Sequence, residues 1–207
     1  SVIRNVNLMN YIPFSHWLEY PIMAALSVKG CTQNCVICGG SAFAGKAMSS
    51  RLKPAFRSPE LLAQDIREMG ALSRAPVFIL GDLRQAGDNY VQRFFRAIQG
   101  FDGTVMVEFF GPVDQAYAEQ LAGALPNFLV EFSPESHDGK VRTASGKHYT
   151  NDEIEETIRV CLDAGAKRFD LFFMIGLSKQ TAASTLETID YTRDLLRKFD
   201  DGRLMPF

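Results

Sequence analysis

Short apolar runs alternate with helical patterns along most of this 207-residue chain. This alternation predicts repeated βα units, because a buried parallel strand is a short apolar run and the crossover that follows it is usually a helix. The expected strands lie within residues 22–28, 76–80, 104–110, 128–133, 169–175 and 203–207. The expected helices lie within residues 58–70, 89–98, 114–125, 150–164 and 182–199. The sequence therefore predicts an α/β fold with five βα units and the opening of a sixth.

Two of the expected helices begin with clear capping signals. Ser58 is a suitable N-cap and Pro59 suits the first helical position. Thr150 and Glu153 have the spacing of a capping box, and Gly165 is a suitable C-terminal stop for the same helix. These signals mark where two of the expected helices begin and where one of them ends.

Parallel strands joined by right-handed crossovers form either an open doubly wound sheet or a barrel. The strands follow one another with no signal for a reversal of strand order, which favours a curved, partial barrel. In such folds the loops after the C-terminal ends of the strands carry the chemistry.

Composition limits the classes of partner. With 46% hydrophobic and 22% charged residues, the chain has the composition of one globular domain. A net charge of -2 gives no general electrostatic reason to bind nucleic acid or an anionic membrane. The apolar runs are far shorter than the roughly 20 residues of a membrane-spanning helix. We expect an irregular lead-in over residues 1–21 and one domain over residues 22–207, which stops before its sixth strand is complete.

Three of the four cysteines, Cys31, Cys35 and Cys38, lie in the loop after the first strand. Three thiols in one loop cannot all pair among themselves, so a secreted disulfide framework fits poorly and a reducing, cytoplasmic location is expected. Clustered thiolates suit zinc or an iron-sulfur cluster. Zinc needs a fourth ligand, for which His16 or Cys161 could serve, although Cys161 lies among apolar helix positions and is expected to be buried. A cubane cluster would have one iron open to an outside ligand.

The spacing Cys31-x-x-x-Cys35-x-x-Cys38 after a first strand resembles the radical S-adenosylmethionine (SAM) superfamily. The stretches "KGCTQNCVICGGS", "FSPESHDGKVRTASGKHYT" and "FFMIGLSKQT" are similar to the branch in which a cobalamin-binding domain precedes the radical SAM domain. The resemblance covers nearly everything from Ile22 onward and implies a partial (βα)6 barrel of the TIM type. It also implies a [4Fe-4S] cluster on the three cysteines, reductive cleavage of SAM to a 5'-deoxyadenosyl radical, and an electron donor such as flavodoxin or ferredoxin. Cobalamin, if used, would be held by a domain outside this chain.

The resemblance also implies contacts to SAM. Ile37 stands where the family commonly places an aromatic residue against the adenine, and Gly176 stands where backbone approaches the adenine. Ser178 and Lys179 replace the family's usual Pro-Gly nearby, which puts that loop in doubt. The remaining implied contacts are the Gly81–Asp82 turn, which is the nearest match to a Gly-Gly-Glu motif, the polar pair Ser133 and Glu135, and Lys147 against the SAM carboxylate.

Other interpretations of these residues stay open. Asp82 could serve only the turn, and Lys147 could be a solvated surface lysine. Glu108 and Glu131 could point into the barrel or form buried ion pairs with Lys or Arg. No residue is assigned to catalysis, and the substrate, a small molecule or another kind, is not identified.

Three functions are therefore compared. The first is a radical SAM enzyme domain, with cobalamin-dependent methyl transfer as one form. The second is a tRNA-modifying enzyme similar to the methylthiotransferases. The third is a zinc or redox module on a βα scaffold, without catalysis.

Overall fold

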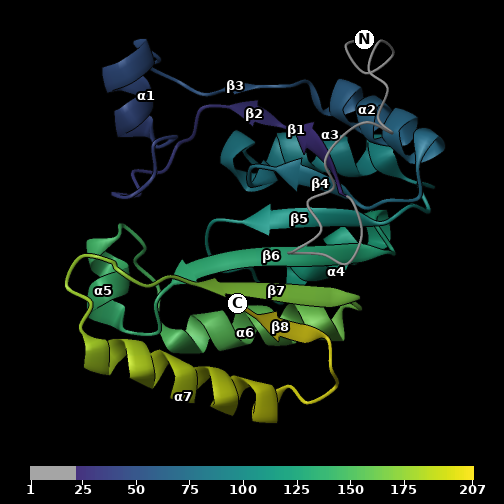
Figure 1. The fold of residues 1–207 in the computed structure, drawn as a ribbon. Coiled ribbons are helices and arrows are strands. Elements are labelled where there is room, and N and C mark those ends of the chain that lie inside the picture. The colour runs from purple at the N-terminus through teal and green to yellow at the C-terminus, as the bar shows by residue number, and fades with distance from the viewer. Residues whose placement is uncertain (1–21) are drawn as a thin grey trace.

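A computed structural model describes residues 22–207. Its centre is a six-stranded parallel sheet in the order β1-β4-β5-β6-β7-β8 (Figure 1). The strands are β1 (Met23–Leu26), β4 (Val77–Leu80), β5 (Val105–Phe109), β6 (Phe128–Glu135), β7 (Arg168–Phe173) and β8 (Leu204–Pro206). Each strand pairs in parallel with the next one in this order. The predicted α/β fold is confirmed, and the strand order shows no reversal.

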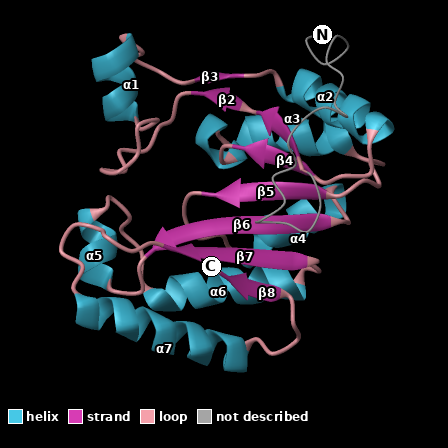
Figure 2. Cartoon of the chain, in the orientation of Figure 1, coloured by secondary structure: helices cyan, strands magenta, loops and turns pink. Residues whose placement is uncertain are grey.

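Five long helices form the crossovers between these strands (Figure 2). Two have the predicted capping. Ser58 accepts a hydrogen bond from the backbone of Leu61, and Thr150 and Glu153 form the complete capping box. The five helices are α2 (Pro59–Leu72), α3 (Asp88–Ile98), α4 (Gln115–Ala124), α6 (Asn151–Asp163) and α7 (Ala182–Lys198).

The region from residue 27 to residue 58 differs from the prediction. The single strand expected at residues 22–28 is divided at Ser27, where the hydroxyl donates a hydrogen bond to the carbonyl of Leu80. Beyond it, β2 (Val28–Lys29) turns away from the sheet and pairs with β3 (Ala55–Phe56) in an antiparallel ribbon. Between the two halves of this ribbon lie the cysteine loop and α1 (Ala42–Ser49), which the apolar pattern did not indicate because none of its residues is buried. Two other short elements were also not expected, η3 (Leu83–Ala86) and α5 (Gly139–Ala144).

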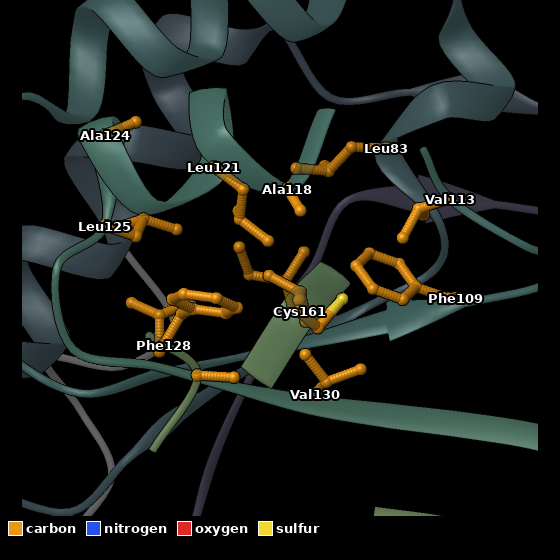
Figure 3. Packing of buried hydrophobic residues seen from close by; sticks show 14 of the residues in the cluster. Leu83, Phe109, Val113, Ala118, Leu121, Ala124, Leu125, Phe128, Val130 and Cys161 are labelled. Atoms are coloured by element: carbon orange, nitrogen blue, oxygen red, sulfur yellow. The ribbon is translucent and has the colours of Figure 1, made fainter. Parts of the chain in front are cut away.

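The main core lies between the outer face of the sheet and the helices. Cys161 of α6 packs in it beside Leu121, Phe109 and Val130 (Figure 3). Its side chain is fully buried, so the expectation that it acts as a small hydrophobic residue is confirmed.

The inner face of the sheet changes character along the strands. Near the strand starts, Phe78, Met106 and Leu129 form a small apolar cluster of their own. Two residues further along two neighbouring strands stand Glu108 and Glu131, which are partners in the register of β5 and β6. The inner face therefore becomes polar toward the C-terminal ends of the strands.

Within residues 22–207 no helix is long and apolar enough to cross a membrane. The predicted lead-in, residues 1–21, and with it His16, lies outside the described residues.

Candidate functional site

The cysteine loop lies beyond the same end of the sheet as α1 and α5 (Figure 1). Its first part is held by Gln85 of η3. The Gln85 side-chain oxygen accepts hydrogen bonds from the backbone and the hydroxyl of Thr32, both at 2.9 Å, and from Cys31 Sγ at 3.2 Å. Backbone N–H groups also point at two sulfurs: Gln33 donates to Cys31 and Gly40 donates to Cys38, both at 3.3 Å. Such N–H groups stabilise thiolates and cluster sulfurs.

The second part of the loop packs on the end of α5. The backbone N–H of Val36 donates to the carbonyl of Ser145 at 3.1 Å. The next residue, Gly146, has a φ of +92°, and a Cβ there would lie 3.1 Å from the carbonyl oxygen of Asn34 and 3.3 Å from Cα of Cys35. Glycine is therefore required both by the backbone conformation and by the close approach of the loop.

All three loop cysteines line one cavity of about 270 Å³. Burial raises the pKa of Cys31, and the nearby thiols of Cys35 and Cys38 raise it further, while the N–H of Gln33 lowers it. Burial also raises the pKa of Cys35, against the lowering effect of Lys147. The other residues that line this cavity are Gln33, Ile37, Ser41, Glu108, Phe109, Phe110, Glu131, Ser133, Glu135 and Lys147.

Among the described residues, no group of three or more His, Cys, Asp or Glu side chains converges as the ligand set of one metal ion. A cubane cluster needs a different arrangement, because each cysteine binds a separate iron and the sulfurs stand around a larger body. Three thiols on one cavity, with N–H groups directed at two of them, fit such a cluster.

Ser133, Glu135 and Lys147 meet at the C-terminal end of β6. The Lys147 ammonium lies 2.7 Å from Glu135 Oε1 and also donates a hydrogen bond to the carbonyl of Ser133. Glu135 follows a register shift in β6 and has a φ of +70°, a conformation uncommon outside glycine. Both side chains are about nine-tenths buried, and Glu135 Oε2 is buried with no hydrogen-bond partner. Lys147 is therefore not a solvated surface lysine, and its pair with Glu135 presents a free acceptor.

Gly81 and Asp82 follow β4 and act differently from each other. Gly81 has a φ of +97°, and its N–H donates to Glu108 Oε2 at 2.6 Å. The Asp82 carboxylate caps η3 through the backbone N–H of Arg84, pairs with the Arg84 guanidinium at 2.6 Å and accepts from the N–H of Phe110 at 2.9 Å. The side chain of Asp82 thus serves the turn, as the alternative interpretation held.

Ile37 and Gly176 are separated in the structure. Ile37 is partly exposed and lines the cysteine cavity. Gly176 has a φ of +84° in the loop after β7, but it is not among the residues that line this cavity. Its neighbours Met174 and Ile175 line a separate, apolar cavity of about 330 Å³ between β7, β8 and α7.

Sequence reasoning missed three residues that hold the cysteine loop: Gln85, Ser145 and Gly146. Gln85 and Ser145 lie in short elements that the apolar pattern does not reveal. Gly146 left a weak signal, since a glycine just before Lys147 indicates a special backbone conformation or a close contact.

The model of the radical SAM superfamily matches residues 26–192.

The chain belongs to the radical SAM superfamily.

Members of this superfamily use a [4Fe-4S] cluster and SAM. A search of curated proteins gives no significant match.

Several solved structures share the radical SAM fold. One is TsrM, a radical SAM methyltransferase from Kitasatospora setae with cobalamin and a [4Fe-4S] cluster bound, with a TM-score of 0.68 and 15% identity, covering 84% of this chain and 34% of that chain. Methylornithine synthase (PylB) has a TM-score of 0.62 and 14% identity, and the match covers 90% of this chain and 53% of that chain. Coproporphyrinogen III oxidase (HemN) from Escherichia coli has a TM-score of 0.58 and 13% identity, and the match covers 84% of this chain and 42% of that chain. The chain thus spans between a third and about half of these proteins, and at these identities the likeness shows the fold.

Proposed function

We propose that this domain holds a [4Fe-4S] cluster on Cys31, Cys35 and Cys38 and reductively cleaves SAM. The observation that supports it best is the shared cavity, in which three thiols of a radical SAM fold meet the polar groups at the ends of β5 and β6. When bound, the reduced cluster supplies the electron that breaks a carbon–sulfur bond of SAM, giving methionine and a 5'-deoxyadenosyl radical.

The residues of the chain bind and orient SAM. Lys147, directed into the cavity beside Glu135, offers a cation for the SAM carboxylate. The free Oε2 of Glu135 and the hydroxyl of Ser133 offer hydrogen-bond partners for the amino or ribose groups of SAM. Ile37 supplies apolar contact at the edge of the same cavity. Gly176, in the loop after β7, is proposed to approach the adenine through its backbone. Gly81 contributes to SAM binding through its backbone, while the carboxylate of Asp82 forms an ion pair with Arg84.

The cluster also needs a protein that supplies the electron. The segment that contains the cysteine loop is both basic and apolar: between Ile22 and Pro59 the sequence has five basic residues and no Asp or Glu. Phe43 and Met48 of α1, and Leu52 after it, are all more than 70% exposed. An acidic one-electron carrier, such as a flavodoxin or ferredoxin, complements this surface next to the cysteines. A reducing cytoplasm, in which such carriers work, is the proposed location.

Cobalamin-dependent methyl transfer is the form of this activity that the sequence resemblance favours, with cobalamin held by a domain outside this chain. A full-length protein with this activity would copurify with cobalamin, which its visible absorption spectrum reports.

Anaerobic reconstitution with iron and sulfide tests the proposed function. We expect a [4Fe-4S] electron paramagnetic resonance signal in the reduced protein that shifts when SAM is added. Changing any one of Cys31, Cys35 or Cys38 to Ala is expected to remove the signal. Cys161→Ala is the matched control: it is expected to keep the signal and to cost about 1–2 kcal/mol of stability, because it removes a buried sulfur from the core. Tight zinc with no cluster would overturn the proposal and leave a structural metal module.

A further inference from the structure

Two acidic side chains lie deeper in the barrel than Ser133 and Glu135. Glu108 of β5 and Glu131 of β6 are partners in the register of neighbouring parallel strands, which lie about 4.8 Å apart. Both side chains line the cavity that the three cysteines share. Glu131 is 7% exposed, and Glu108 is partly buried.

Neither carboxylate has a counter-cation among the described residues. Glu131 Oε1 accepts a hydrogen bond from the hydroxyl of Ser133, and Glu108 Oε2 accepts one from the N–H of Gly81. The second oxygen of each accepts no hydrogen bond from residues 22–207, and no ion pair involves either residue in that part of the chain. The nearby ammonium of Lys147 is paired with Glu135. The buried ion pair with Lys or Arg that the sequence left open for these residues is therefore absent from the described structure.

Two adjacent carboxylates, one buried and one partly buried, with no cation paired to either, are unfavourable when both are ionised. Burial, and then the charge of Glu108, raise the pKa of Glu131 to about 8. Burial likewise raises the pKa of Glu108, while the N–H of Gly81 lowers it. The charge of Lys147 lowers the pKa of both carboxyls, but less than burial raises it, so the described protein leaves this pair to be neutralised mainly by a proton or by a bound cation.

We propose that Glu108 and Glu131 bind a positively charged group of the substrate, a primary ammonium or a guanidinium. Both side chains line one cavity from neighbouring strands, and each has an oxygen without a hydrogen bond in the described structure, which suits a donor with several N–H groups. The zwitterionic end of SAM is already complemented by Lys147 and Glu135, of which Glu135 stands four residues beyond Glu131 at the C-terminal end of β6. A group that reaches Glu108 and Glu131 therefore belongs to a second molecule, deeper in the barrel. This inference rests on the proposed function, because it assigns SAM to the outer part of the same cavity.

The test uses the reconstituted protein with SAM and saturation-transfer nuclear magnetic resonance of small probes at pH 8. Hexylamine and hexylguanidine are compared with hexanol, which has a similar chain and no charge. We expect both cations to bind and hexanol to bind at least about tenfold more weakly, because a buried charge-assisted hydrogen bond lowers the dissociation constant about tenfold or more. In the double variant that carries both Glu108→Gln and Glu131→Gln, the preference for the cations over hexanol is expected to disappear. Glu119→Gln, on the exposed face of α4, is the matched control and is expected to keep it.

The spectrum of the reduced cluster with SAM separates this inference from the proposed function. We expect the double variant to keep the cluster and the shift caused by SAM. Loss of that shift in the double variant would overturn the inference, because the carboxylates would then serve SAM. Equal binding of hexanol and hexylamine would overturn it too, and would indicate that the pair is neutralised by a shared proton. If the unchanged protein shows no SAM shift but binds hexylamine through the two carboxylates, the cation site stands and the proposed function fails.

Discussion

At the scale of single residues, charge balance decides the properties of the cavity. Lys147 neutralises Glu135 across 2.7 Å, and Arg84 neutralises Asp82 across 2.6 Å. Glu131 has no such partner among the described residues, and its pKa is raised to about 8, first by burial. A buried carboxylate of this kind is stabilised in its protonated form and makes stability depend on pH.

Glu131→Gln is expected to change how the stability of the apoprotein depends on pH. An unfolded glutamate loses its proton near pH 4.5, whereas folded Glu131 keeps it to about pH 8. Between these values the folded state binds more protons, so the free energy of unfolding contributed by Glu131 falls as pH rises, by about 2–4 kcal/mol in all. Urea unfolding of both proteins between pH 5 and 8.5 measures the difference, and Gln should give the more stable protein at pH 8.5. A constant difference across this range would show that Glu131 titrates normally.

At the scale of elements, the position of the cysteine loop depends on short pieces that contribute little to the main core. Gln85 in η3 holds the start of the loop, and the end of α5 holds its middle through Ser145 and Gly146. These elements follow β4 and β6, so the parallel sheet brings both of them to the same side as the loop after β2. The sheet therefore positions the loop indirectly.

Gly146→Ala is expected to impair the cysteine loop more than it destabilises the fold. A Cβ at this residue would crowd Asn34 and Cys35, and the φ of +92° adds strain of about 1 kcal/mol. We expect a clear loss of iron bound after reconstitution, measured per mole of folded protein. Gly165→Ala is the matched control: its φ is +102°, but a Cβ there meets nothing within 4 Å. It should cost similar stability and keep the iron, and equal iron loss in both variants would contradict the role given to Gly146.

At the scale of the whole molecule, charge is unevenly distributed. The net charge of the chain is -2, yet the segment around the cysteine loop is basic and carries exposed apolar side chains on and after α1. Figure 1 shows α1 projecting from the sheet beside this loop. A uniform surface would not select between partners, whereas this one favours an acidic protein close to the cluster site.

Reversing two charges at this surface is expected to slow reduction of the cluster by flavodoxin. Lys46→Glu with Lys53→Glu should lower the second-order rate about tenfold at low salt, and the difference should shrink at high ionic strength because salt screens exposed charges. Stopped-flow absorbance of the reconstituted protein gives the rate. Lys167→Glu is the control, since Lys167 is exposed just before β7, at the opposite end of the strand from the loop. An equal effect of the control would show that only net charge matters.

Much of the fold could be predicted because its signals are local. The capping groups of Ser58 and Thr150 and the apolar stripe of each crossover helix act within a few residues, so they are visible in the sequence. The spacing of Cys31, Cys35 and Cys38 is local too, and it was enough for the family. By contrast, α1 buries no residue and has no apolar stripe, and Gln85 acts on a loop more than fifty residues away. Such residues carry no sequence signal of their own.

The sequence by itself determined the order of the six sheet strands and the five crossover helices, and the family, because each of these depends on residue type and short spacing. Only the tertiary structure decided which charges meet. It pairs Lys147 with Glu135 and Asp82 with Arg84, and it leaves Glu108 and Glu131 together without a cation among the described residues. Electrostatic partners depend on distances between side chains in the folded chain, which residue order alone does not specify; for Glu108 and Glu131 those distances are fixed by parallel pairing and register.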